Sequence, residues 1–234
     1  MFKKIFFANV MILFVFFVSV FILNKSVTAF REQKPVPINH CVVIDPGHGG
    51  IDGGATSVTG TLESHLNLEI SLRLRDLCNF LGINTKMIRV DDRSVHTEGE
   101  SIAQKKVSDL KNRVQIANEQ NNAILVSIHQ NYFADKKYYG AQVFYSDTRG
   151  SEVLALEMQH ALVGNLYPES NRKTKKASRI YLMDHINCTG VLIECSFISN
   201  YEDAIKIEDV EYQKKLSSVI ATTLTSYINE FTVS

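Results

Sequence analysis

The sequence predicts an α/β domain built on a single open, twisted and mostly parallel sheet that is flanked by helices. Three apolar runs rich in β-branched residues lack the alternation of half-exposed strands, as is typical of strands buried on both faces of a parallel sheet: 42–44, 123–128 and 191–193. Between and after them, apolar residues recur at helical spacing. The 234 residues suffice for one such domain with a short appendage.

The N-terminal segment, residues 1–29, is predicted to be a signal peptide or a membrane anchor. Two lysines precede the apolar run 5–23, which is long enough to cross a bilayer as a helix. Small residues before Ala29 offer a cleavage site, so removal and retention both stay open. In either case we expect the rest of the chain outside the cytoplasm, as a linker over 30–39 and a folded domain over 40–234.

The composition argues against several classes of protein. Lys plus Arg and Asp plus Glu number 25 each, and this balance gives no reason to expect a nucleic-acid partner. The four cysteines form no C-x-x-C pair, which argues against a zinc knot or a dense disulfide framework, and Cys41 and Cys195 are expected to be buried free thiols. The basic run 171–179 is interpreted as solvated surface, with a rim that attracts an anionic polymer as the alternative.

The elements are expected in a βαβ-like order. After the first strand, a loop over 51–60 leads to a helix that is capped by Thr61 and ends at Gly82. The remaining elements are a strand over 83–88, a polar connection over 89–108, a helix from Asp109, strands over 123–128, 140–145, 180–183 and 191–193, a helix capped by Ser151, and a closing helix over 214–231.

Side chains that can bind metal follow the buried runs. His48 lies on a glycine-rich turn after the first run, His129 and Glu194 end two others, and Glu63 lies in the first turn of a helix. Because parallel strands point their carboxyl ends the same way, these side chains should gather at one sheet edge. The alternative for His48 is a turn histidine that has no function. The alternative for Glu63 is a carboxylate that complements the helix dipole.

Two imidazoles and a carboxylate are a ligand set for catalytic zinc, so we predict a site formed by His48, Glu63 and His129. Glu194 then fits a general base that takes a proton from water and delivers it to a leaving nitrogen, which is the chemistry of amide hydrolysis. Other divalent ions also suit such a set. Candidate substrate-binding residues are Asn131, Asn67 and Arg89, and surface or structural roles are expected for His40, His65, His96, His160 and His185.

At these residues the chain resembles the zinc-dependent N-acetylmuramoyl-L-alanine amidases. The similar stretches are 43–50, 52–55, Leu62-Glu63 with Asn67-Leu68, 113–131, and 191–194 with 197–200. The resemblance implies a phosphorylase/hydrolase-like fold, zinc held by His48, Glu63 and His129, and Glu194 as catalytic acid and base. It also implies the substrate, the amide between the lactyl group of N-acetylmuramic acid and L-alanine of the peptidoglycan stem peptide.

Within this family, the short chain, the N-terminal span and the segment 179–183 resemble the germination-specific amidases of endospore formers. That resemblance implies spore cortex maturation toward muramic-δ-lactam, in the space between forespore and mother cell membranes. The alternatives are a vegetative cell-wall autolysin, a non-catalytic wall-binding module of the same fold, and a zinc peptidase acting on other peptides.

Two positions depart from the family pattern. Ser64 stands where lysine is frequent, and Ser196 stands where glycine is common. Because the groups around metal ligands affect metal affinity roughly 10–100-fold, these changes predict weakly held zinc. We therefore expect that an activating protein partner or the substrate completes the site. The other expected partners are peptidoglycan and, if the N-terminal span is retained, the membrane.

Overall fold

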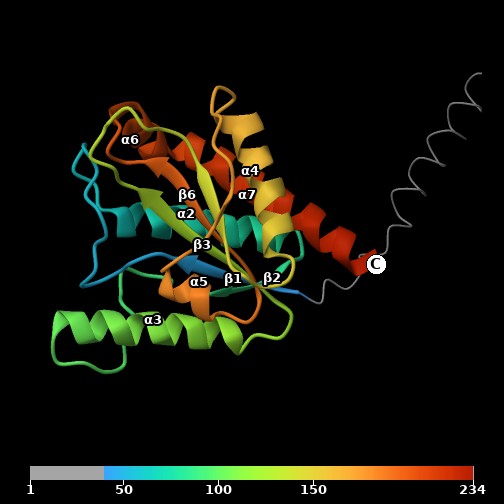
Figure 1. The fold of residues 1–234 in the computed structure, drawn as a ribbon, viewed down its shortest axis with the longest axis horizontal. Helices are drawn as coiled ribbons and strands as arrows, with labels where there is room; N and C mark the ends of the chain where they lie inside the picture. The colour runs from blue at the N-terminus through green and yellow to red at the C-terminus, as the bar shows by residue number, and fades with distance from the viewer. Residues whose placement is uncertain (1–39, 234) are drawn as a thin grey trace, which may run out of the picture. The chain divides into compact units, whose positions relative to one another are not determined.

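A six-stranded sheet runs through the part of the chain that the computed structural model describes, residues 40–233 (Figure 1). The predicted span 1–29 and linker 30–39 lie outside the described residues. The elements are β1 (Cys41–Pro46), α2 (Glu63–Phe80), β2 (Asn84–Met87), α3 (Ile102–Asn118), β3 (Ala123–Asn131), β4 (Gln142–Tyr145), α4 (Ser151–Leu166), β5 (Lys175–Lys176), α5 (Tyr181–His185), β6 (Thr189–Phe197), α6 (Tyr201–Glu208) and α7 (Val210–Val233).

The strand order is β2-β1-β3-β6-β4-β5, and β1, β3 and β6 lie side by side in parallel at the centre (Figure 1). Their register aligns Pro46 with Ile128 and Ile128 with Ile193, so the three carboxyl ends meet at one edge. The predicted α/β class is confirmed. The sheet is mixed rather than purely parallel, because β4 runs antiparallel to β6.

Both faces of the sheet are covered. Helices α2, α4 and α7 pack on one face, and α3 and α5 cover the other (Figure 1). Val42 and Ile44 belong to the larger core cluster and Val43 to the smaller one, and all three are fully buried. Burial on both faces explains why these strands have no polar alternation.

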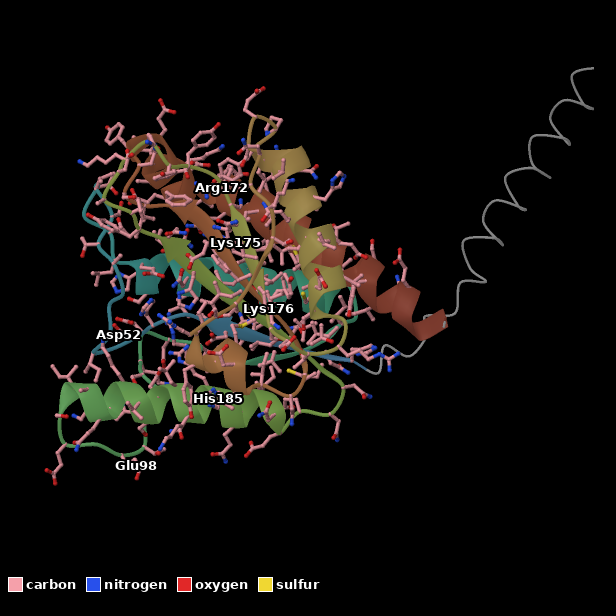
Figure 2. All side chains as sticks on the ribbon, in the orientation of Figure 1. Asp52, Glu98, Arg172, Lys175, Lys176 and His185 are labelled. Atoms are coloured by element: carbon pink, nitrogen blue, oxygen red, sulfur yellow. The ribbon has the colours of Figure 1, made fainter. Side chains whose placement is uncertain are left out.

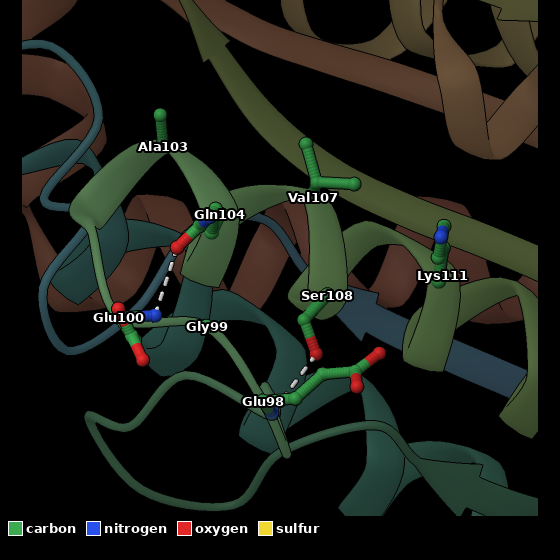
Figure 3. Close-up of a pocket in the computed structure, with 8 residues that line it drawn as sticks. All are labelled: Glu98, Gly99, Glu100, Ala103, Gln104, Val107, Ser108 and Lys111. Carbon is green, nitrogen blue, oxygen red and sulfur yellow. Dashed lines mark hydrogen bonds between the residues drawn. The ribbon is translucent and has the colours of Figure 1, made fainter.

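The helix predicted to start at Asp109 begins at Ile102 instead, because Ser101 and Gln104 form a capping box. The Ser101 side chain accepts a hydrogen bond from the Gln104 backbone, and the Gln104 side chain accepts from the backbone of Ser101 and of Glu100, at 2.9 Å for the latter (Figure 3). The signal was present in the sequence as S-x-x-Q. The polar surroundings obscured it.

The strand predicted over 180–183 is wrong, because this segment enters the short helix α5. Leu182 and Met183 are buried in the smaller core cluster. The preceding basic run contributes the edge strand β5, which pairs with β4 and carries the exposed Lys175 and Lys176 (Figure 2). Lysines on an edge strand discourage pairing with another chain.

None of the helices within residues 40–233 has the length and apolar character needed to cross a bilayer. The four cysteines are free; Cys195 is buried as expected, and Cys41 is half-buried.

Candidate metal centre

The turn after β1 is held in a strained conformation that presents His48. This residue has a φ of +61°, which is uncommon for a side chain other than glycine. Two buried arginines hold the turn from below: Arg113 donates to the His48 carbonyl at 2.6 Å, and Arg89 donates to the Gly47 carbonyl at 2.9 Å. A Cβ at Gly47 would overlap the His129 ring, so this position requires glycine.

The predicted ligand residues come together on three elements: the turn after β1, the first residue of α2, and β3. The Glu63 Oε1 atom lies 3.1 Å from His129 Nδ1 and 3.3 Å from His48 Nε2. One ligand atom from each residue lies within 4.8 Å of the other two. The two imidazole rings meet nearly edge to face, with centroids 5.0 Å apart. These distances are short enough for the three residues to share one metal ion.

The electrostatics of this cluster favour a cation. Burial opposes protonation of His48, yet the Glu63 and Asp52 carboxylates outweigh it and raise its pKa to about 9. Burial likewise opposes ionisation of Glu63, but His129 and His48 lower the pKa of this carboxyl well below its usual range. A divalent ion bound to this donor set would replace the proton that His48 otherwise holds, so the residues present fit zinc.

Asp52 fixes the orientation of His48. Its Oδ2 atom accepts a hydrogen bond from His48 Nδ1 at 2.9 Å. Its Oδ1 atom pairs with Nζ of Lys106, a residue of α3, at 2.8 Å. The loop after β1 carries Asp52 to this rim of the molecule (Figure 2). With the Nδ1 proton committed to a carboxylate, Nε2 presents its lone pair to the cluster, as in the carboxylate–histidine–metal arrangement. Sequence reasoning assigned no role to Asp52, although it follows His48 by only four residues.

The Glu63 carboxylate is anchored on both oxygens. Oε2 accepts from the Ala55 backbone at 3.0 Å, and Oε1 accepts from the Gln130 backbone at 3.1 Å and from Asn67 Nδ2 at 3.4 Å. These donors fix the carboxylate independently of the histidines. They also explain its burial at 4% exposure without loss of its charge.

Glu194 occupies the cleft beside the two histidines. The cleft measures about 340 Å³, and its apolar lining residues are Ile51, Leu110, Ile180, Leu182 and Leu192. Burial raises the pKa of Glu194 to about 7, and the nearby Glu63 charge adds to this rise against the opposing effect of the histidines. Its Oε2 is buried and has no hydrogen-bond partner among the described residues. β6 continues to Phe197, so Glu194 lies within the strand rather than at its end as predicted.

The predicted substrate-binding residues have different positions. Asn67 and Arg89 are 0% and 1% exposed and bind backbone carbonyls of the turn and its neighbourhood. They offer no surface to a substrate, so the prediction is corrected to positioning of the turn. Asn131 is half-buried at the end of β3 and stays a candidate. The five other histidines lie outside the cluster of ligand atoms.

A buried ion-pair network beneath the turn was missed by sequence reasoning. Arg113 contacts the carboxylates of Asp45 at 2.5 Å and Asp109 at 2.6 Å, and Ser127 donates to Asp45 at 2.6 Å. Burial would raise the pKa of Asp45, but Arg113 and Ser127 outweigh it and lower the pKa. Only the tertiary pairing of β1 with β3 and α3 reveals this network.

A second hollow, of about 670 Å³, lies between residues 98–100 and the start of α3 (Figure 3). Its lining includes Glu98, Glu100 and Lys111, but it has no histidine or cysteine. The cleft at His48 is therefore the better candidate site.

Comparisons with known proteins agree on one family. Residues 42–226, which include all four site residues, match the family described as N-acetylmuramoyl-L-alanine amidase. The germination-specific N-acetylmuramoyl-L-alanine amidase of Bacillus subtilis is 33% identical over 220 residues, covering 92% of each chain. The structure of the CwlD amidase from Clostridioides difficile, in complex with the GerS lipoprotein, aligns with a TM-score of 0.77 and 37% identity, covering 81% of this chain and 98% of that one.

Proposed function

This chain belongs to the N-acetylmuramoyl-L-alanine amidase family, and we propose that it is a zinc-dependent amidase of peptidoglycan. The bond cleaved is the amide between the lactyl group of N-acetylmuramic acid and L-alanine of the stem peptide. The observation that carries this proposal is the convergence of His48, Glu63 and His129 beside a carboxyl group whose pKa is raised to about 7.

In this proposal, His48, Glu63 and His129 hold the metal. A divalent ion bound there would polarise the amide carbonyl and lower the pKa of the attacking water to about 7. Glu194 accepts a proton as the water oxygen bonds to the carbonyl carbon, and it returns that proton to the alanine nitrogen as the C–N bond breaks. A pKa near neutrality suits both transfers. The products are a lactyl carboxylate on the glycan and a stem peptide with a free amino end.

The biological setting is also proposed. Similarity to a germination-specific amidase supports a role in spore cortex maturation toward muramic-δ-lactam. Similarity to an amidase whose structure is in complex with a lipoprotein supports a protein partner, and we propose that such a partner activates the enzyme. Peptidoglycan as substrate requires action outside the cytoplasm, which fits an export signal or anchor within residues 1–29.

The test is hydrolysis of purified peptidoglycan by the full chain, before and after treatment with a chelator and after zinc is restored. We expect mass spectrometry to find whole stem peptides with free L-alanine amino groups, and their release to follow zinc. Stem peptides cut internally would favour the zinc peptidase instead. Zinc-independent wall binding without release would favour a binding module.

A further inference from the structure

Three buried polar side chains connect β6 to the carboxylate of Glu63: Ser196, Gln130 and Asn67, here called the amide relay. Ser196 Oγ donates to Gln130 Oε1 at 2.9 Å, Gln130 Nε2 donates to Asn67 Oδ1 at 3.1 Å, and Asn67 Nδ2 donates to Glu63 Oε1 at 3.4 Å. Each member is at most 3% exposed. We infer that the amide relay positions Glu63 for metal binding, an inference that rests on the proposed function.

An irregularity in the sheet brings Ser196 into this relay. From the pair His129 and Glu194 to the next pair, Asn131 and Phe197, β3 advances by two residues and β6 by three. Gln130 therefore faces a bulge that contains Ser196. Bulges are frequent beside active sites, where they redirect a side chain. Here the bulge comes directly after Glu194, and it turns the Ser196 hydroxyl toward Gln130.

The relay has a direction, because each donor points toward Glu63. The Ser196 hydroxyl sets the Gln130 amide with its oxygen toward β6, which turns the Gln130 nitrogen toward Asn67. If Gln130 were reversed, its oxygen would face Asn67 Oδ1, and two acceptors would be in contact. The Asn67 nitrogen also donates to the Gly47 carbonyl at 3.2 Å, beside the His48 turn. The relay thus ties together the supports of two metal ligands.

The contact between Ser196 and Gln130 changes the interpretation of Ser196, one of the two departures from the family pattern. Ser196 was expected to weaken zinc binding. Its hydroxyl instead supplies the first donor of a chain in which successive hydrogen bonds polarise one another. Removing that hydroxyl leaves the buried Gln130 oxygen without its donor, and it frees the amide to turn. We therefore expect Ser196 to strengthen the hold on the ion through Glu63.

The test measures zinc affinity of the full chain by competition with a fluorescent chelator, together with the thermal midpoint of the zinc-free protein. Ser196→Ala should weaken zinc binding about 10-fold. Ser196→Thr should restore much of it. The matched control is Ser217→Ala on α7, a fully buried serine that donates to the Ile70 carbonyl at 3.3 Å and does not touch the relay. It should leave zinc affinity unchanged while lowering the zinc-free midpoint as much as Ser196→Ala does.

A second variant, Gln130→Glu, removes the donor to Asn67 with little change of shape and should weaken zinc binding at least as much as Ser196→Ala. The inference is overturned if both variants bind zinc like the unsubstituted chain, or if Ser217→Ala weakens binding equally. In those cases the unsubstituted chain still binds zinc and the proposed function survives. If the unsubstituted chain itself binds no zinc, the proposed function fails and the relay has no ion to serve.

Discussion

Glu63 and Glu194 lie at the same edge of the sheet, but their surroundings differ. Glu63 accepts hydrogen bonds on both oxygens and contacts two imidazoles, and its pKa lies below the usual range. Glu194 has one buried oxygen without a partner, and burial raises its pKa to about 7. Two carboxylates with divergent pKa values are the usual sign of divided roles in an active site. In the proposed mechanism, Glu63 keeps its charge and holds the metal, and Glu194 exchanges a proton.

The largest effect should follow from Glu63→Ala, which removes a ligand and leaves two imidazoles without their shared acceptor. We expect zinc binding and turnover to fall together, turnover to the uncatalysed background. Metal analysis of the purified variant and release of stem peptides measure the two losses. Zinc retained in full by this variant would contradict the assignment of Glu63.

Glu194→Gln should separate chemistry from binding. The amide keeps the shape of the carboxyl group but cannot accept the proton, so we expect kcat to fall by about 10²–10⁴. Zinc content should match the unsubstituted chain. If turnover persisted near the original rate, the proton would have to pass through another group and the comparison between the two carboxylates would be wrong.

The network beneath the turn should affect stability more than chemistry. Asp45→Asn breaks one of the two ion pairs of the buried Arg113 and leaves Asp109 as its remaining carboxylate partner, so we expect a loss of at most the roughly 3–5 kcal/mol that breaking a buried pair typically costs. Because the pKa of Asp45 is lowered by folding, its stabilising contribution is present above the unfolded value of about 3.9 and is lost as the pH falls below it. Urea unfolding should show a gap between the two proteins at pH 7 that narrows in acid. A gap independent of pH would contradict this origin.

The smallest effect concerns Asp52, the carboxylate that orients His48. Asp52→Asn should lower zinc affinity by about 10-fold, at the low end of the range for such contacts, while the three ligands remain. A chelator competition measures it. The control is Asp91→Asn, which should leave zinc affinity unchanged. Asp91 is an exposed carboxylate in the loop after β2 and pairs with Arg93.

The sequence was most informative where one physical requirement dominated. Uninterrupted apolar runs revealed the central strands, and the direction shared by parallel strands placed His48 and His129 at one edge. The start of α3 and the helical form of α5 were harder to predict. The start of α3 depends on a short polar capping signal, Ser101 with Gln104. In α5, Leu182 and Met183 are buried in the smaller core cluster, and their short apolar run also suited a strand. For the site, local patterns could not show that Asn67 and Arg89 are buried, or that Arg113 lies beneath the turn. Those facts depend on which strands become neighbours.

Of the three proposed ligands, His129 is far along the chain from His48 and Glu63, because β2 and α3 lie between them. No short stretch of the unfolded polypeptide can therefore gather the ion, and the site forms only when the central strands have paired. If the chain folds after export and depends on zinc, as proposed, the supply of zinc at the place of folding would set the active fraction of the enzyme. The metal content of the compartment in which the protein is synthesised would not.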